Sequence, residues 1–266
     1  MCSPWLVFLE TPISGCSNGR QELIFPHTLY TDLFLLCYNV FSVVNIKEVN
    51  TVGALAILED TSLVQLSESL LPDVLTDIYL DEKNIVIWQR SLAPDLVSAL
   101  QQHLREKSSI KLSLTLSPDD AAEVLENQLS QVSCSTELAS ALAELVEMFC
   151  CLFDLERAGL RLTTLEKAMC PKFHVDKVPC RLVTTLTGPG TQWLPNDLLS
   201  RDGLGAGAAH FTLYEDDRDI QQMTLGDVAL LKGERWIGNE NRGIVHRSPP
   251  VDSGDRRLLL TLDFAD

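Results

Sequence analysis

Three residues in the C-terminal half have the types and spacing of a mononuclear metal site. His174 and Asp176 form a His-x-Asp pair, and His246 follows well downstream. Residues i and i+2 of an extended strand point to the same face, so His174 and Asp176 can face one cavity. Two histidines and one carboxylate can occupy one face of an Fe(II) ion and leave positions open for substrate and oxygen. The pattern therefore predicts His174, Asp176 and His246 as metal ligands.

Arginines that follow the His-x-Asp pair suit a ligand that the same chemistry requires. Arg257 opens the last predicted strand, and a guanidinium can hold the carboxylate of a 2-oxo acid through two parallel hydrogen bonds. Arg256 is the alternative, because neighbouring strand residues face opposite ways and a register shift of one exchanges them. Arg181 is either a further carboxylate-binding residue or a surface charge. We therefore expect cosubstrate binding by Arg257, with Arg256 and Arg181 as further candidates.

A closed zinc site is the alternative for the same residues. Cys170 precedes His174 by four positions, and Cys170, His174, Asp176 and His246 would complete a tetrahedral site for structure, storage or sensing. On a regular strand, however, Cys170 would lie about 13 Å from His174. We therefore expect Cys170 to be a buried core thiol. The donor set by itself is compatible with iron and with zinc.

The elements that must position these residues change in character near residue 159. Before it, hydrophobic spacing predicts helices at residues 62–80, 94–107 and 136–154, a helix start at Ser117-Pro-Asp-Asp, and strands at 84–90 and 110–116. After it, turn residues separate short β-rich segments at 160–165, 180–186, 210–214, 227–231, 243–246 and 256–264. The predicted fold class is α+β, with a helix-rich N-terminal half and a double-stranded β-helix (a jelly-roll, cupin-like barrel) as the C-terminal half.

The change from predicted helices to short β-rich segments also suggests how the chain divides into parts. We expect a poorly ordered extension over residues 1–49, a helix-rich part over 50–158, and the metal-binding jelly roll over 159–266. Three of the eight cysteines fall in the extension, which shows little periodicity.

Composition narrows the classes of partner and compartment. The formal net charge of −16 argues against nucleic acid or an anionic membrane surface as the main partner. The eight cysteines form no CxxC pair, and Cys150 and Cys151 lie in an apolar run where buried free thiols are expected, so a reducing compartment follows. The most apolar stretch, residues 29–44, is too short to span a membrane and contains Asp32. A cytoplasmic protein is the expectation.

Two resemblances add to this interpretation. The order His-x-Asp, distal His and Arg on a closing strand resembles the Fe(II)/2-oxoglutarate dioxygenases, and residues 225–233 resemble the strand and turn before their distal histidine. From about residue 84 onward the chain is also similar to the bacterial domain-of-unknown-function 1826 family. The blocks that carry this likeness begin at Gly159 (Gly-Leu-Arg-Leu), Ala168 (Ala-Met-Cys-Pro-Lys-Phe-His-Val-Asp-Lys-Val-Pro-Cys-Arg-Leu-Val), Gly188 (Gly-Pro-Gly-Thr-Gln-Trp-Leu) and Val245 (Val-His-Arg-Ser-Pro-Pro).

These resemblances imply different functions. The first implies a dioxygenase that uses Fe(II) and 2-oxoglutarate to hydroxylate an unknown small-molecule or protein substrate. The second carries no settled activity, and implies loosely a protein of zinc homeostasis, linked to metal-chaperone GTPases, that binds Zn(II) without catalysis. A third interpretation is a cupin-like domain that binds a small ligand without a redox metal. It would be supported if Arg257 pointed outward and the triad failed to converge.

Overall fold

The computed structural model describes residues 65–106, 109–205 and 212–265. Its elements, in chain order, are β1 (Leu66–Ser69), the 3-10 helix η2 (Pro72–Tyr79), β2 (Ile85–Trp88), α2 (Pro94–Arg105), β3 (Lys111–Leu116), α3 (Ala121–Gln128), α4 (Ser135–Phe153), β4 (Ala158–Leu165), β5 (Cys180–Thr187), β6 (Gln192–Leu194), the 3-10 turns η3 (Asn196–Leu198), η4 (Arg201–Gly203) and η5 (Asp217–Asp219), β7 (Gln221–Gln222), β8 (Val228–Lys232), β9 (Val245–Arg247) and β10 (Arg257–Phe264).

The strands form two sheets. The larger has the order β1-β2-β8-β5-β10-β4-β3, and the smaller has the order β7-β6-β9. All neighbouring pairs are antiparallel except β1 with β2, which are parallel. An antiparallel bridge between His174 and His246 adds a short extended segment beside β9. The protein is therefore a mixed α/β structure built on a large, mostly antiparallel sheet.

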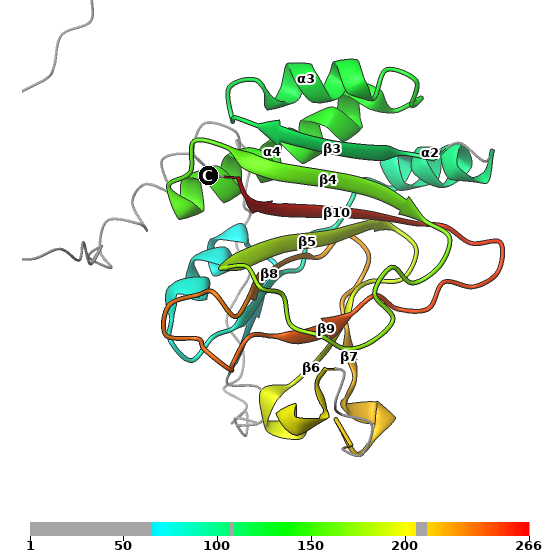
Figure 1. Ribbon diagram of the computed structural model, residues 1–266. Helices are drawn as coiled ribbons and strands as arrows, with labels where there is room; N and C mark the ends of the chain where they lie inside the picture. Colours follow the sequence, from blue (N-terminus) through cyan, green and yellow to red (C-terminus); the bar gives the residue numbers. More distant parts are fainter. Residues whose placement is uncertain (1–64, 107–108, 206–211, 266) are drawn as a thin grey trace, which may run out of the picture.

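The large sheet has a different covering on each face. Figure 1 shows α3 and α4 on one side of it and the small sheet β7-β6-β9 on the other. Side chains alternate between these faces along each strand. On β10, Leu258, Leu260 and Leu262 join the core on the helix side, whereas Leu259 packs with the cluster that contains Trp193 of β6. Every second residue of the central strands thus faces the small sheet.

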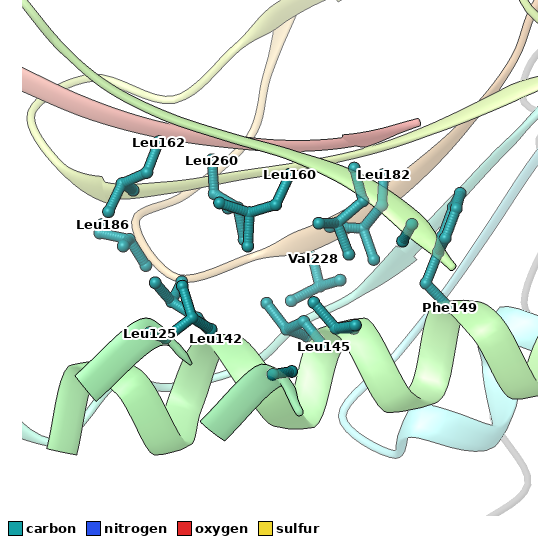
Figure 2. Close-up of a cluster of buried hydrophobic side chains, with 14 of the residues drawn as sticks. Leu125, Leu142, Leu145, Phe149, Leu160, Leu162, Leu182, Leu186, Val228 and Leu260 are labelled. Carbon is teal, nitrogen blue, oxygen red and sulfur yellow. The ribbon is translucent and has the colours of Figure 1, made fainter. Parts of the chain in front are cut away.

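The main core lies between α4 and the large sheet. Leu138, Leu142, Leu145 and Phe149 recur at helical spacing along α4, and all are buried. They meet leucines from β4, β5 and β10, as Figure 2 shows for Leu160, Leu182 and Leu260, among others. The helix ends at Asp154, which has the left-handed backbone conformation (φ 52°) that aspartate tolerates better than most residues. This packing gives the large sheet a rigid backing.

Most of the predicted elements are present. The helices expected at 94–107 and 136–154 are α2 and α4, and the strands expected around 85, 111, 160, 180, 228, 245 and 257 are confirmed as β2, β3, β4, β5, β8, β9 and β10. The helix that begins after Ser117 is α3, whose first residue is Ala121 because Asp120 accepts a hydrogen bond from the Ser117 amide and forms a turn first. Cys150 is buried and free, and Cys151 is free and partly buried.

Three expectations differ from the structure. The helix expected at 62–80 is wrong for its described residues: Leu66–Ser69 is a strand that pairs with β2, and only Pro72–Tyr79 is helical, as a 3-10 helix. Here tertiary pairing overrides local periodicity. Of the strand expected at 210–214, Tyr214 forms only an isolated bridge to Leu199, and residues 210–211 lie outside the described part. β6 and β7 were not predicted, because strands of two or three residues leave no periodic signal.

A helix-rich first half is not what the described residues show. β1, β2 and β3 alternate with helices there, and they pair into the same sheet as β4, β5, β8 and β10. The expected extension over 1–49 lies outside the described residues, and the division at residues 158 and 159 stays a prediction. Among the described helices, none is both long and apolar enough to cross a membrane.

The core between α4 and the sheet generates a stability prediction. Leu142→Ala removes a fully buried side chain and should lower the free energy of unfolding by about 3 kcal/mol, since it deletes apolar contacts and leaves a cavity. Glu147→Ala, at an exposed position of the same helix, should change it by less than about 0.5 kcal/mol. Urea denaturation followed by circular dichroism measures both. Equal effects of the two substitutions would contradict this placement of the core.

Candidate metal centre

His174 and His246 lie directly opposite each other on neighbouring extended segments. The amide of each donates a hydrogen bond of 3.0 Å to the carbonyl oxygen of the other. Such a doubly hydrogen-bonded antiparallel pair places the two side chains on one face of the sheet. The imidazole centroids are 4.6 Å apart. On the other side of β9, His246 pairs with Trp193 of β6, so its strand is held from both edges.

Asp176 completes the group. It lies two residues after His174, on the same face of the segment, as the sequence predicts. Its Oδ1 is 3.6 Å from Nε2 of His174, and its Oδ2 is 3.4 Å from Nε2 of His246. One potential ligand atom from each residue lies within 4.8 Å of the other two, and this is the one such group among the described residues. The structure therefore brings the three predicted ligands together.

The hydrogen bonds of the histidines determine which nitrogen is available. Nδ1 of His174 lies 3.0 Å from the carbonyl oxygen of Lys172, and Nδ1 of His246 lies 3.1 Å from that of Ile244. A carbonyl oxygen can only accept, so each Nδ1 carries a proton, which leaves Nε2, the nitrogen that faces Asp176, as the possible metal ligand. This is the arrangement that metal-bound histidines commonly show.

These separations match what one ion requires. Metal–ligand bonds of about 2.1 Å place two ligand atoms about 3.0 Å apart at a right angle and about 3.4 Å apart at a tetrahedral angle. Nε2 of His246 and Nε2 of His174 approach different oxygens of Asp176, at 3.4 and 3.6 Å, and the group of ligand atoms lies within 4.8 Å, so side-chain rotations must draw it together around one ion. The donor set and its spacing thus fit a divalent transition metal.

Arg181 fixes the carboxylate of Asp176. Its Nη1 donates to Oδ2 of Asp176 at 2.5 Å, while Nε and Nη2 form a forked pair with Asp263 at 2.7 and 2.9 Å. Burial by itself would raise the pKa of Asp176, but the hydrogen bond and charge of His246, together with the charge of Arg181, lower this pKa to about 2. Asp176 is therefore an anion throughout the physiological range, and Asp263 holds the arginine that orients it.

Electrostatics also favour a neutral His174. Burial lowers the pKa of its ring, and the neighbouring His246 lowers it further, against opposing effects of the Lys172 carbonyl and Asp176. A neutral imidazole is the form that binds a metal.

A glycine allows the loop that carries Asp176 to lie close to the sheet. The backbone of residues 176–178 passes over Gly233, where an added Cβ would lie only 2.1 Å from the carbonyl oxygen of Val178. At this contact the amide of Glu234 donates to the carbonyl oxygen of Asp176 at 3.0 Å. Any side chain at 233 would push this loop, and Asp176 with it, away from the sheet.

Arg257 is fully buried on the face of β10 that looks toward the small sheet. Its Nη1 donates to Ser248 Oγ at 3.0 Å, and its Nη2 donates to Thr185 Oγ1 at 3.0 Å and to Thr191 Oγ1 at 2.8 Å. Its Nε has no partner, and burial alone lowers the pKa of this guanidinium to about 10.

This environment contains hydroxyl groups but no anion. No carboxylate among the described residues pairs with Arg257. Buried charges in proteins are normally paired, so a buried cation without an anionic partner among the described residues is unusual. Ser248, which accepts a hydrogen bond from Arg257, follows His246 by two residues along the chain. Arg257 therefore lies near the metal centre along this segment.

The other candidate residues lie elsewhere. Arg256 faces the opposite side of β10, where it donates to the carbonyl oxygen of Leu104 and to Glu166. Arg181 binds Asp176 and Asp263 rather than presenting a free fork. The expectation that Cys170 is a buried thiol is wrong, since it is exposed, and it does not belong to the triad's group of ligand atoms.

Several residues of the site were not identified from the sequence. Ser248, Thr185 and Asp263 each contact one of the two inward arginines. Strand alternation could have found them, because Ser248 shares the face of His246, Thr185 that of Arg181, and Asp263 that of Arg257.

Comparison with known proteins gives a family and a set of distant structures. The model of a family described as "Protein of unknown function (DUF1826)" matches residues 69–263. No curated protein matches the chain. Similar solved structures include a dioxygenase for auxin oxidation in rice, with 13% identity, 68% of this chain and 72% of that chain covered, and a TM-score of 0.38.

Two further structures lie at a similar distance. A prolyl-4-hydroxylase from Pseudomonas putida has 14% identity, with 74% of this chain and 99% of that chain covered and a TM-score of 0.37. JOX2 in complex with 2OG, Fe and JA has 12% identity, with 75% and 74% covered and a TM-score of 0.40. At these values the likeness carries no inference about activity.

The Arg181–Asp263 pair generates a prediction about metal affinity. Asp263→Asn should weaken Fe(II) or Zn(II) binding by about 10- to 100-fold, because Arg181 loses its forked partner and no longer holds Asp176 in place. Isothermal titration calorimetry under anaerobic conditions measures this. Asp255→Asn, an exposed change of the same kind, should leave the affinity unchanged. Unaltered affinity in Asp263→Asn would show that the triad does not depend on this pair.

The lowered pKa of Asp176 generates a pH prediction for the metal-free protein. A carboxylate with a depressed pKa adds stability above its ordinary pKa near 4, and this stability is lost as the pH falls toward about 2. Asp176→Asn should therefore be less stable than wild type by about 2 kcal/mol at pH 6, with the gap closing between pH 4 and pH 2. Urea titrations at several pH values, in the presence of a chelator, test this. A gap independent of pH would contradict it.

Proposed function

Because the chain belongs to the DUF1826 family, whose description assigns no activity, we propose its function from the site itself: an Fe(II)- and 2-oxoglutarate-dependent oxygenase. The observation that supports this most is the pairing of two features. A triad of two histidines and one aspartate has the spacing of a metal centre, and a fully buried arginine without an anionic partner lies beside it. A 2-oxo acid needs both, because its keto acid end binds the metal and its far carboxylate needs a cation.

The order of the strands supports the double-stranded β-helix expected for such an enzyme. In chain order, β4, the His174 segment, β5, β6, β7, β8, β9 and β10 pass back and forth between two facing sheets, with β6 and β7 as consecutive strands of the smaller sheet. One sheet contains the order β8-β5-β10-β4, and the other is β7-β6-β9 followed by the His174 segment. A chain that winds between two antiparallel sheets in this way is a jelly roll. β1, β2 and β3 extend its larger sheet at both edges.

The chain's own residues have separate tasks in this proposal. Nε2 of His174, Nε2 of His246 and Asp176 would hold the iron, and Arg181 would keep Asp176 oriented. Arg257 would bind the distal carboxylate of 2-oxoglutarate, with the hydroxyls of Ser248, Thr185 and Thr191 beside it. The bound Fe(II) and 2-oxoglutarate would supply the oxidative chemistry that hydroxylates a substrate. Burial of Arg257 and His246 keeps water from this inner side, which strengthens the ionic contact.

The zinc-binding and metal-free interpretations have less support. A closed zinc site needs a fourth protein ligand, and the described residues offer three in one group, with Cys170 exposed outside it. A ligand-binding domain without a metal would need a dispersed triad and an outward Arg257, and the structure has neither.

Anaerobic Fe(II) titration with and without 2-oxoglutarate tests the proposal. We expect a 2-oxoglutarate-dependent charge-transfer band in the visible spectrum, and we expect His246→Ala to abolish it because a metal ligand is lost. Arg257→Gln should raise the 2-oxoglutarate concentration for half-maximal absorbance by about 30-fold or more, the equivalent of about 2 kcal/mol for a broken buried ion pair. It should leave Fe(II) affinity within about threefold, since it does not touch the triad.

Arg256→Gln is the matched control, because it makes the same chemical change at the neighbouring residue that faces away. It should leave the 2-oxoglutarate dependence unchanged. Tight Zn(II) binding through the same residues, with no band in the presence of Fe(II) and 2-oxoglutarate, would overturn the oxygenase assignment. Equal effects of Arg256→Gln and Arg257→Gln would overturn the role of Arg257.

A further inference from the structure

A cavity of about 950 Å³ lies against the outer side of the metal centre. His174 forms part of its wall, and the His174 side chain is 34% exposed, whereas that of His246 is 9% exposed. The cavity is therefore reached from the His174 side, away from the buried Arg257. Its volume is in the range of pockets that hold small organic ligands.

The charge of this cavity is opposite to that of the whole protein. Lys172, Lys177 and Arg247 line it, in a chain whose formal net charge is −16. The acidic residue in the wall, Glu234, lies 3.8 Å from Arg201 and so is largely balanced. Asp217, near Tyr214, and Asp176, which is paired with Arg181, contribute the other nearby negative charges. A surplus of positive charge remains, and a low-dielectric cleft concentrates its effect on an incoming anion.

One wall of the cavity is aromatic and held in place. The rings of Phe173 and Tyr214 are 5.6 Å apart in an edge-to-face arrangement. The guanidinium of Arg247 lies 4.3 Å from the Phe173 ring centre on the other side, and its Nε donates to Gln192 at 2.8 Å. Phe173 is the residue immediately before His174. A flat ligand on this wall would thus lie beside the metal centre.

We propose that this cavity is the substrate pocket, and that it takes a small aromatic anion whose flat body packs on Phe173 and Tyr214 while its charge meets Lys172, Lys177 and Arg247. That the bound molecule is a substrate rests on the proposed oxygenase function, whereas the preference for an aromatic anion rests only on the residues of the cavity.

Three probes with the same bicyclic carbon skeleton separate the contribution of negative charge from that of the aromatic ring. We expect 2-naphthoate to bind about tenfold more tightly than the uncharged 2-naphthamide, and about tenfold more tightly than decahydro-2-naphthoate, which keeps the charge but lacks the ring. Ligand-observed NMR titrations of the full chain measure all three. Equal affinity of the acid and the amide would overturn the anionic preference, and equal affinity of the aromatic and saturated acids would overturn the role of the aromatic wall.

Charge reversal localises the site. Lys172→Glu/Lys177→Glu should reduce naphthoate binding by tenfold or more, and both residues are exposed, so folding should be unaffected. Lys111→Glu/Arg157→Glu makes the same change in net charge at exposed positions outside the cavity and should leave binding within about twofold. Equal losses in the two double variants would indicate a general charge effect and would overturn the site.

Mn(II) distinguishes failure of this inference from failure of the proposed function. With Mn(II) bound, as followed by water proton relaxation, bound naphthoate in the cavity should show strong paramagnetic broadening that is lost in His246→Ala. Mn(II) binding without broadening would place the ligand elsewhere and overturn the pocket. Charge-dependent naphthoate binding in a protein that binds no Mn(II) would overturn the metal centre while leaving the anionic preference supported.

Discussion

The two hydrogen bonds between the backbones of His174 and His246 are the constraint on which the metal centre depends. They set two segments far apart in the sequence directly opposite each other, so that both imidazoles emerge on one face. Asp176 then follows from strand alternation, without a further long-range contact of its own. The carbonyls of Lys172 and Ile244 turn both Nε2 atoms toward it. A shift of this pairing by one residue would turn His246 away from His174 and Asp176.

The inner face of the large sheet carries two arginines in contrasting electrostatic environments, Arg181 partly buried and Arg257 fully buried. Arg181, near the start of β5, is neutralised by Asp176 and Asp263. Arg257, at the start of β10, has hydroxyl partners and an unpaired Nε. The first arrangement stabilises the protein as it stands, whereas the second retains a desolvated charge without compensation. Arg181 therefore orients a potential metal ligand, whereas Arg257 would bind an anion in the proposed function.

The surroundings of the triad also differ from one side to the other. Toward Arg257 the site is enclosed by the two sheets, and His246 is buried. Toward Phe173 and Arg247 it borders a cavity with surplus positive charge. The enclosed polar side and the open aromatic side would suit two different ligands, which in the proposed function meet at the metal centre. The rigid backing of the large sheet by α4 keeps both sides in register, because a close-packed core transmits little movement.

The sequence by itself determined the residue types and their local spacing. His-x-Asp on an extended segment, the β-rich segments between turn residues, and the periodicity of α2 and α4 are local properties, and they predicted the triad and most elements. Only tertiary structure decided that Arg257 rather than Arg256 faces inward, that Arg181 is shared by Asp176 and Asp263, and that Cys170 is exposed. It also decided that residues 66–69 form an edge strand. These outcomes depend on strand register and on partners distant in sequence, which local periodicity does not encode.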